Sequence, residues 1–366
     1  MSLRTLSIRG VRNLNDNEIN LSQGVNVFFG DNGAGKTSVL ESVHLLAMNR
    51  SFQQSRTRTA VSLNADLAIL SAELCDGDQL LVKRSSDGKS SVALNGKAVT
   101  SVSSLVTKLP TQLIHSGSFK LLEGSPSDRR KYLDWGVFHT SSDFMAVWQH
   151  FQKCLKNRNS LLRSGKIDRS QMAVWEQGFI ESAVKIDQMR QRYLAEFSPV
   201  FKQILQQLVE LDDVDISYYR GWDKTKDFSA VLEAQRHRDL KLGYSQSGPQ
   251  RADLKVKVSN LNAVDVLSRG QQKLVVCALK IAQSRLLQSK VTQPSIFLVD
   301  DLPSELDERH IHKLCLLLEE IGCQVFMTAI EPDTFKNIWL KPDQIDMFHV
   351  EHGSVTRVTN LGESNV

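Results

Sequence analysis

Residues 30–37 read Gly30-Asp31-Asn32-Gly33-Ala34-Gly35-Lys36-Thr37, and this stretch decides the fold. Its spacing, G-x-x-x-x-G-K-[ST], is that of a loop that wraps phosphate groups. A short apolar strand, residues 25–29, runs directly into the loop, and residues 36–48 carry apolar side chains at helical spacing after it. A phosphate-binding loop requires this strand and this helix, so we expect all eight residues to bind a nucleotide.

The residue types in the loop also indicate what they would bind. Glycines let the backbone N–H groups converge on phosphates, and the positive end of the helix dipole adds to the attraction. In such loops the lysine, here Lys36, reaches the β- and γ-phosphates, and the hydroxyl that follows, here Thr37, binds Mg²⁺. The stretch therefore predicts a nucleotide together with a magnesium ion.

A second stretch, Ile296-Phe297-Leu298-Val299-Asp300-Asp301, has four apolar residues followed by two carboxylates. Ligands of open α/β sheets bind at the carboxyl edge of the strands, which is where both aspartates would lie. We expect Asp300 to hold Mg²⁺ together with Thr37, and Asp301 and Lys36 to be catalytic, with Asp301 orienting or deprotonating an attacking water. A strand that ends in Asp is common, so this prediction depends on the upstream loop.

A third stretch, Leu267-Ser268-Arg269-Gly270-Gln271, begins just over thirty residues before Asp300. Ser268 and Gln271 have the spacing of a capping box for a helix expected over residues 271–288. A Ser hydroxyl, a Gly backbone and an Arg at a helix N-terminus also form an anion site. The two interpretations are compatible.

The order of elements indicates a divided α/β protein. Residues 67–100 contain hairpin-turn dipeptides such as Asn95-Gly96 and predict an antiparallel meander. Residues 125–210 carry two aromatic stripes at helical spacing and predict an antiparallel helical hairpin. In the last third, helices and strands alternate, as in a parallel sheet covered by helices. We expect a mixed α/β head in two parts, residues 1–124 and 241–366, with a helical arm, residues 125–240, inserted between them.

Composition excludes several classes of protein. The chain has 366 residues, a net charge of +4 and a hydrophobic share of 41%, all ordinary for a globular protein. No run approaches the roughly 18 apolar residues that a membrane span needs. The five cysteines form no C-x-x-C pair, which disfavours a disulfide framework or a zinc knot and favours a reducing compartment. We expect a cytoplasmic protein with no membrane partner.

The three stretches in this order, followed by Ser304-Glu305-Leu306-Asp307, resemble the ATPase heads of ABC-type and SMC-like proteins. Three further similarities narrow the resemblance to the RecF family. The chain start resembles the family's I-x-x-F-R-N opening, a later block resembles its R-R-x-x-L-D block, and a third resembles its signature helix. These segments are Ile8-Arg9-Gly10-Val11-Arg12-Asn13-Leu14, Arg129-Arg130-Lys131-Tyr132-Leu133-Asp134-Trp135 and Ser268-Arg269-Gly270-Gln271-Gln272-Lys273.

The resemblance implies ATP as the nucleotide and a P-loop ABC/SMC-type head with a short helical arm. It implies an ATP-dependent homodimer, in which the signature of one subunit completes the ATP site of the other. The residues to which it assigns these roles are Ser268, Arg269, Gly270 and Gln271 in the signature and Ser304 and Asp307 in the D-loop at the interface. It further implies that Arg12 and Asn13 approach the nucleotide and that Gln112 senses metal and water.

A local basic excess points to DNA as a partner. Residues 120–170 contain ten Lys and Arg against five Asp and Glu, a larger excess than that of the whole chain. Such a field attracts phosphate backbones, although a solvated helical face has the same composition. From charge placement we predict DNA contacts by Lys153, Lys156, Arg158, Arg163, Lys166, Arg50, Arg56 and Arg58.

These observations together favour an ATP-switched DNA-binding protein with slow, DNA-dependent ATP hydrolysis. ATP would close the dimer, and closure would assemble a basic surface for single-stranded and duplex DNA. The resemblance implies roles in recombinational repair, replication and SOS induction, and action at single-strand/double-strand junctions and gaps. It also implies that RecO and RecR are partners in loading a recombinase.

Two other classes remain as alternatives. The ATPase subunit of an ABC transporter would share the three stretches, but 232 residues separate Lys36 from Ser268, far more than such a subunit normally has. Transporters also place a His where this chain has Thr328-Ala329-Ile330, and a Glu where it has Asp301. A P-loop kinase or a GTPase needs no signature helix, and the N-K-x-D motif of GTPases is absent from the sequence.

Overall fold

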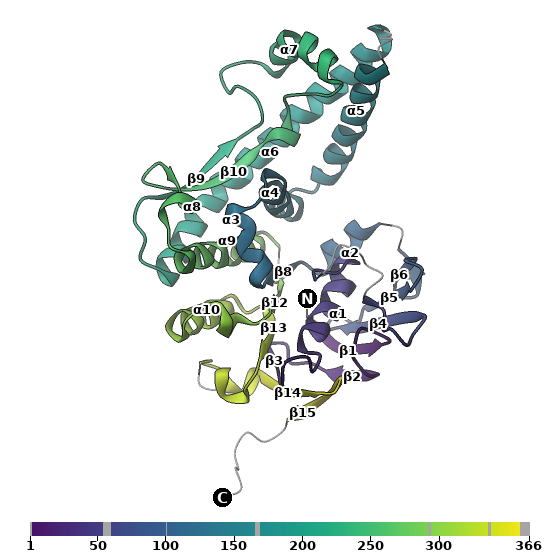
Figure 1. The fold of residues 1–366 in the computed structure, drawn as a ribbon, viewed down its shortest axis with the longest axis vertical. Helices are drawn as coiled ribbons and strands as arrows, with labels where there is room; N and C mark the ends of the chain where they lie inside the picture. Colours follow the sequence, from purple (N-terminus) through teal and green to yellow (C-terminus); the bar gives the residue numbers. More distant parts are fainter. Residues whose placement is uncertain are drawn as a thin grey trace, which may run out of the picture. The chain divides into compact units, whose positions relative to one another are not determined.

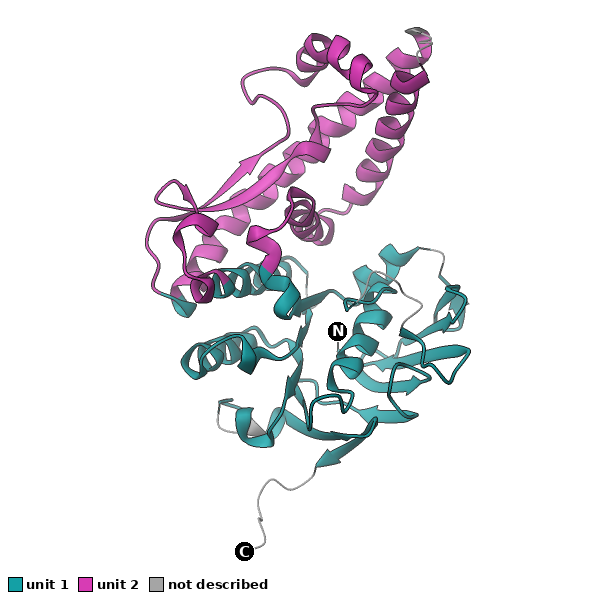
Figure 2. Cartoon of the chain, viewed as in Figure 1, with its two compact units in different colours: residues 1–119, 207–209, 273–366 teal, residues 120–206, 210–272 magenta. Residues whose placement is uncertain are grey.

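The computed structural model describes residues 2–53, 60–99, 101–164, 169–291, 294–335 and 338–358. The chain forms two compact units, shown in different colours in Figure 2. Unit 1 consists of residues 1–119, 207–209 and 273–366, and unit 2 of residues 120–206 and 210–272. The inserted unit therefore extends to residue 272, whereas the sequence analysis ended the arm at residue 240.

Unit 1 is built on a six-stranded sheet in the order β15-β14-β3-β13-β12-β8 (Figure 1). Its strands are β3 (Val25–Phe29), β8 (Thr111–Ile114), β12 (Ile296–Val299), β13 (Gln324–Ala329), β14 (Ile345–Glu351) and β15 (Ser354–Val358). Five of them pair in parallel, whereas β15 pairs antiparallel with β14. Every residue of β3, β12 and β13 is buried, as is typical of central strands whose two faces are both covered.

This strand order brings distant segments of the chain to one edge of the sheet. β3 lies between β13 and β14, and β12 follows β13. Because parallel strands point the same way, the residues that follow β3, β8, β12 and β13 meet at their carboxyl ends. The prediction that the strand before the phosphate-binding loop shares a sheet with the C-terminal strands is confirmed.

A second, antiparallel sheet completes unit 1 in the order β2-β1-β4-β5-β6-β7. Its strands are β1 (Leu3–Arg9), β2 (Asn17–Asn20), β4 (Leu67–Leu74), β5 (Gln79–Ser85), β6 (Ser90–Leu94) and β7 (Lys97–Ala98). The predicted meander is confirmed, and its turn residues Asn95 and Gly96 both have positive φ, as a type I′ hairpin turn requires. One apolar core joins this sheet to β3 and to the helix after the phosphate-binding loop.

The helices of unit 1 are α1 (Lys36–Met48), α2 (Val102–Lys108), most of α9 (Arg269–Lys290) and α10 (Glu308–Ile321). Short 3-10 turns are η2 (Ser116–Phe119), η4 (Leu302–Ser304), η5 (Pro332–Phe335) and η6 (Pro342–Gln344). α1 contacts strands of both sheets. α10 begins after its N-cap Asp307, whose side chain accepts from the His310 N–H, and ends at Gly322 in the left-handed conformation.

Unit 2 is mainly helical. Its elements are α3 (Lys120–Glu123), α4 (Pro126–Thr140), α5 (Phe144–Ser164), α6 (Arg169–Leu208), β9 (Val214–Tyr219), α7 (Phe228–Leu242), η3 (Pro249–Arg251), β10 (Asp253–Val258), β11 (Leu261–Asn262) and α8 (Ala263–Val266). Phe151 of α5 stacks on Phe179 of α6, with ring centroids 5.3 Å apart, and both rings are buried. The aromatic stripes therefore pack the core of the predicted helical hairpin, and residues 165–168, between its two helices, lie outside the described residues.

Unit 2 also contains a three-stranded antiparallel sheet, in the order β11-β10-β9, that the sequence analysis did not predict. β9 and β10 are separated in the chain by α7, so no hairpin turn marks their pairing. The alternation of Leu254, Lys255, Val256, Lys257 and Val258 is the local sequence signal for β10.

The structure contradicts the prediction that Arg158 contacts DNA. Its side chain is fully buried and donates to Glu176 Oε1 at 2.9 Å and to Asp239 Oδ2 at 2.8 Å. A further hydrogen bond reaches the hydroxyl of Ser245 at 2.7 Å. Arg158 therefore joins α5 to α6, α7 and the loop after α7, and its charge is neutralised within unit 2.

We expect Arg158→Met to destabilise the protein by about 3–5 kcal/mol, because it leaves the buried Asp239 carboxylate without its cation and leaves Glu176 with Arg236 alone. Chemical denaturation followed by circular dichroism measures the effect. The matched control is Arg163→Met on the same helix, where an exposed arginine is replaced and a change within about 0.5 kcal/mol is expected. Equal losses of unfolding free energy in the two variants would contradict the interior role of Arg158.

Candidate nucleotide-binding site

Two glycines of the phosphate-binding loop occupy positions that larger residues do not fit. Gly30 has a φ of 142°, and a Cβ there would lie 2.3 Å from the carbonyl oxygen of Val350. Gly35 has a φ of 120°, and a Cβ there would lie 2.8 Å from Leu14 Cδ2. The loop therefore depends on these glycines for its tight turn between β3 and α1.

The N-terminus of α1 is arranged to receive an anion. Gly35 is the N-cap residue, and no described side chain caps the first turn of the helix. Lys36 Nζ donates to the carbonyl oxygens of Gly30 and Asp31 at 2.6 and 2.9 Å, which holds the ammonium group over the loop. Uncapped N–H groups, the helix dipole and this ammonium group together suit a chain of phosphates.

A hydrogen-bonded chain joins the loop to the predicted metal-binding strand. Thr37 Oγ1 donates to Asp300 Oδ1 at 2.9 Å, and Thr328 Oγ1 donates to the same oxygen at 3.0 Å. Thr328 in turn accepts from the backbone N–H of Asp301 at 2.8 Å. Hydroxyl and carboxylate oxygens are ligands that Mg²⁺ prefers, so Thr37 and Asp300 fit the predicted ion.

Burial shifts the proton affinity of both charged groups at this site. It raises the pKa of the Asp300 carboxyl above its ordinary value, against the hydrogen bonds from Thr37 and Thr328 that lower it. It lowers the pKa of the Lys36 ammonium, against the attraction of nearby aspartates, chiefly Asp301. A divalent cation at Asp300 and phosphates at Lys36 would stabilise the charged forms, so each group lies where its counter-ion is expected.

These groups line one pocket of about 430 Å³ in unit 1. Its lining is Asn13, Asn32, Gly33, Gly35, Lys36, Thr37, Ser38, Gln53, Ser116, Asp300, Asp301, Thr328, Ala329 and Ile330. The structure therefore brings together the phosphate-binding loop and the two aspartates, as predicted. The loop residues Gly30, Asp31 and Ala34 contribute backbone hydrogen bonds behind this lining.

Six lining residues were not predicted from the sequence: Ser38, Gln53, Ser116, Thr328, Ala329 and Ile330. Thr328 lies within β13, one residue before its end, while Ser116 follows β8 and Gln53 comes after α1. A polar residue near the end of an apolar strand was the available signal for Thr328. Ser116 was harder to find, because only the strand order shows that β8 lies beside β12.

Arg12 and Asn13, both expected near the nucleotide, have different surroundings. Asn13 lines the pocket, donates to the carbonyl oxygen of Gly33 at 2.8 Å and accepts from the Ser38 hydroxyl at 2.9 Å. Arg12 instead forms two hydrogen bonds, of 2.8 and 2.9 Å, with the carboxylate of Glu41, which is buried in α1. Arg12 therefore holds the helix behind the phosphate-binding loop rather than facing the pocket.

The structure contradicts the assignment of Gln112 as a sensing residue. Gln112 is buried within β8, opposite Phe297 of β12, and its amide donates to Gln283 of α9 at 3.2 Å. Of this segment only Ser116, which follows the strand, lines the pocket. Burial lowers the pKa of the neighbouring His115 to about 4, so its imidazole is neutral at pH 7.

The signature residues form the predicted capping box. The N–H of Gln271 donates to Ser268 Oγ at 3.3 Å, and the N–H of Ser268 donates to Gln271 Oε1 at 3.0 Å. Ser268, Arg269 and Gly270 are exposed at the start of α9, in unit 2. The D-loop residues Ser304 and Asp307 are exposed in unit 1, where Ser304 Oγ donates to the Asp301 carboxylate at 2.8 Å.

Of the predicted DNA contacts, Lys153, Lys156 and Arg163 are exposed on α5, and Arg50 is exposed after α1. Arg56, Arg58 and Lys166 lie outside the described residues.

None of the helices in the described part of the chain is both long enough and apolar enough to cross a bilayer.

Comparison with known proteins decides the family. The model of the RecF/RecN/SMC N terminal domain matches residues 2–356. A curated relative from Pseudomonas aeruginosa (strain LESB58), the DNA replication and repair protein RecF, is 45% identical over 366 residues and 99% of both chains. The chain belongs to the RecF family. A relative of the same name from Pseudomonas fluorescens (strain Pf0-1) is 45% identical over 361 residues and 98% of both chains.

Solved structures agree with this RecF assignment at the level of the fold. A structure described as the recombination mediator protein RecF-ATP in RecFOR pathway has a TM-score of 0.84 at 22% identity and 98% coverage of both chains. An Smc head domain from Pyrococcus furiosus has a TM-score of 0.58 at 15% identity, covering 98% of this chain and 96% of that one. The predicted RecF resemblance, fold class and role in DNA replication and repair are confirmed, and the transporter alternative has no support.

We expect Thr37→Val and Asp300→Asn to remove the part of nucleotide affinity that depends on Mg²⁺. Each removes a charged or hydroxyl oxygen ligand, so the affinity with Mg²⁺ should fall about 10- to 100-fold, the equivalent of ~1.5–3 kcal/mol. Titration with a fluorescent ATP analogue, in Mg²⁺ and in EDTA, measures this. The control is Thr356→Val, at an exposed threonine of β15. If a variant kept the full difference in nucleotide affinity between Mg²⁺ and EDTA, the prediction that the replaced residue binds Mg²⁺ would be refuted.

Proposed function

We propose that this RecF-family protein is an ATP-dependent DNA-binding protein of recombinational repair, in which ATP held between two copies closes a dimer on DNA. The observation that carries the proposal is the pocket of unit 1. It combines a phosphate-binding loop, the Thr37–Asp300 pair suited to Mg²⁺, and a second carboxylate, Asp301. The family assignment supports DNA as the partner, and the neighbour described as RecF-ATP supports ATP as the nucleotide.

Hydrolysis of ATP would release the closed state. Asp301 lies in the pocket with a φ of 54°, an uncommon conformation for a non-glycine residue, and its carboxylate is held by the Ser304 hydroxyl. In the proposed role Asp301 orients the attacking water and accepts its proton, while Lys36 stabilises charge on the phosphates. Thr37 and Asp300 would hold Mg²⁺, which supplies further stabilisation of that charge when it is bound.

The second half of the proposed ATP site would come from the signature of the other copy. Ser268 and Gly270 are exposed, and a Cβ built on Gly270 meets no described atom within 4 Å. The first turn of α9 therefore offers an open backbone, a hydroxyl and the Arg269 cation, which suit a γ-phosphate. Because every chain carries both halves, two copies would enclose two nucleotides.

The proposed duplex-DNA surface lies on α5 and extends to α7. Lys153, Lys156 and Arg163 are exposed on α5, and α7 adds the exposed Arg238 and Lys241. The ends of the two helices adjoin, because a Cβ on Gly243 would lie 2.9 Å from Arg163 Cγ. Contacts of this kind bind phosphates with little regard to base sequence.

The wider setting follows from the same proposal. We place the protein in the cytoplasm, acting at gaps and single-strand/double-strand junctions with RecO and RecR, in replication, repair and SOS induction. The neighbouring structures described as belonging to the RecFOR pathway support RecO and RecR as partners.

We expect a charge-reversed variant, Lys153→Glu with Lys156→Glu and Arg163→Glu, to bind a gapped duplex at least tenfold more weakly in ATP and Mg²⁺. Each lost phosphate contact should reduce the slope of log affinity against log salt by about 0.9. Fluorescence anisotropy at several salt concentrations, in ATP and in ADP, measures both quantities. The control reverses three exposed lysines elsewhere in unit 2, Lys185, Lys224 and Lys226. Unchanged affinity and slope in the α5 variant would exclude this surface.

We expect the wild-type protein to form dimers in the presence of ATP and Mg²⁺. Under the same conditions, we expect the variant Ser268→Asp to stay monomeric. Aspartate keeps the helix cap but places a negative charge where a phosphate is expected. Ser268→Asn keeps the cap without the charge and is the matched control, which should dimerise more readily than the aspartate variant. Analytical ultracentrifugation measures the populations. A wild-type protein that remains monomeric at saturating ATP and DNA would refute the dimer.

A further inference from the structure

One face of the three-stranded sheet in unit 2 is only partly covered, with Asp215, Tyr219 and Lys255 exposed, and we call it the open face. Leu254 and Val256 of β10 are buried on the other face, and Tyr218 of β9 donates its hydroxyl to Asp187 of α6 at 3.1 Å. Side chains alternate along a strand, so the open face carries the remaining positions of both strands. Those positions are Asp215, Ser217 and Tyr219 of β9 and Asp253, Lys255 and Lys257 of β10.

Tyr219 is an unusual residue for such a face. Its side chain is large and aromatic, yet the residue is 53% exposed. It pairs with Asp253 across the strands, which makes Lys255 its diagonal neighbour on the same face, within reach of long side chains. The face therefore presents an aromatic ring beside a cation.

The carboxylates on the open face are already neutralised, whereas its lysines are not. Asp253 accepts two hydrogen bonds from Arg129, of 2.7 and 3.1 Å, and Asp215 pairs with Lys202 at 2.5 Å. Lys255 is exposed, and Lys257 is half-buried directly opposite Asp215, whose carboxylate is already paired with Lys202. The net charge that this face offers to a ligand is consequently positive.

A second cation and aromatic ring lie beyond the end of β9. The N–H of Gly248 donates to the carbonyl oxygen of Gly221 at 3.1 Å, so the turn that carries Arg251 adjoins the chain just after Tyr219. The Arg251 guanidinium lies over the ring of Tyr244, 5.3 Å from its centroid, and both residues are exposed. Tyr244 directly follows Gly243, whose Cβ position lies 2.9 Å from Arg163 Cγ, so this pair belongs with the surface proposed on α5 and α7.

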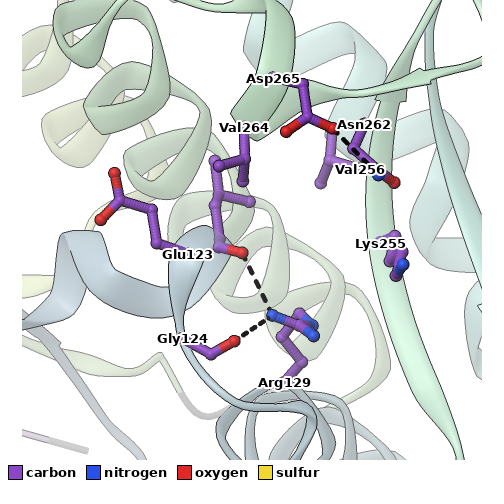
Figure 3. A pocket seen from close by; sticks show the side chains of 9 residues that line it. Glu123, Gly124, Arg129, Lys255, Val256, Asn262, Val264 and Asp265 are labelled. Atoms are coloured by element: carbon purple, nitrogen blue, oxygen red, sulfur yellow. Dashed lines mark hydrogen bonds between the residues drawn. The ribbon is translucent and has the colours of Figure 1, made fainter.

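A pocket lined by charges of both signs lies beside Lys255. Figure 3 shows Lys255 at this pocket of about 210 Å³, together with Glu123, Asp265 and Arg129 from other elements. Asn262 donates to the Asp265 carboxylate at 3.2 Å, and Arg129 pairs with Asp253. The two acids and two cations of the lining leave the pocket without a formal net charge.

We infer that the open face of β9 and β10, centred on Tyr219, Lys255 and Lys257, binds single-stranded DNA. An exposed ring stacks on a base only where that base is unpaired, while lysines beside it contact the backbone. A duplex offers its phosphates but not its base faces, so this face would select the single-stranded part of a gapped substrate. The inference rests on the proposed DNA binding but concerns a surface separate from that on α5.

The test compares Tyr219→Thr with Tyr219→Phe in the full-length protein with ATP and Mg²⁺. Threonine keeps a strand-forming residue and removes the ring, whereas phenylalanine keeps the ring. The probes are a 30-nucleotide oligothymidylate and a blunt 30-base-pair duplex, each followed by anisotropy. We expect Tyr219→Thr to weaken oligothymidylate binding about 5- to 100-fold, with duplex binding and the thermal midpoint unchanged. Tyr219→Phe should stay within about twofold of wild type on both probes.

Lys255→Gln with Lys257→Gln should reduce the salt slope on oligothymidylate by about 1.4, that is ~0.7 for each lost phosphate contact. Lys224→Gln with Lys226→Gln is the matched control. Photocrosslinking to 5-bromodeoxyuridine in the oligonucleotide should label the peptide that contains Tyr219. Oligothymidylate affinity that is unchanged in Tyr219→Thr would overturn the inference and leave the face to a protein partner. A wild type that binds neither probe would instead overturn the proposed DNA binding itself.

Discussion

The structure of the candidate site depends on one contact, the hydrogen bond from Thr37 to Asp300, which joins residues 263 positions apart in the chain. The two oxygens can meet only if β3 and β12 are parallel strands of one sheet with their carboxyl ends at the same edge. β13 lies between them and supplies Thr328, which bonds to both aspartate positions. Strand order, loop geometry and the predicted metal ligands are therefore aspects of one arrangement.

Unit 2 has buried arginine–carboxylate ion pairs in its interior. Arg158 bonds to Glu176 and Asp239, and the buried Arg190 bonds to Asp134 through two hydrogen bonds of 2.8 and 2.9 Å. Buried ion pairs contribute little net stability against apolar packing but penalise arrangements that leave one partner unpaired. We interpret these pairs as fixing which faces of α4, α5, α6 and α7 meet.

Much of the fold could be predicted because its signals are local. β3 and α1 have the predicted bounds, since an apolar strand, a glycine-rich loop and a helical stripe adjoin in the sequence. The errors concern residues whose surroundings are set by distant segments. Arg158 was assigned to a DNA-binding surface because charge alone does not indicate burial. Gln112 was given a sensing role from the family resemblance, and the four-residue β8 gives too short a pattern to show that its side chain is buried.

The division of unit 1 among distant parts of the chain has a consequence for folding during synthesis. The central strand β3 is made early, but both of its neighbours, β13 and β14, are made after residue 320. Unit 2 needs only residues 120–272 apart from a three-residue interruption, so all of its segments leave the ribosome before unit 1 is complete. Contacts of such long sequence separation form slowly. Every residue of β3 is buried in the finished fold. During synthesis β3 therefore stays without its neighbouring strands until some three hundred further residues have been made. An apolar strand left unpaired for that long is prone to aggregate, which is the situation that chaperones counteract.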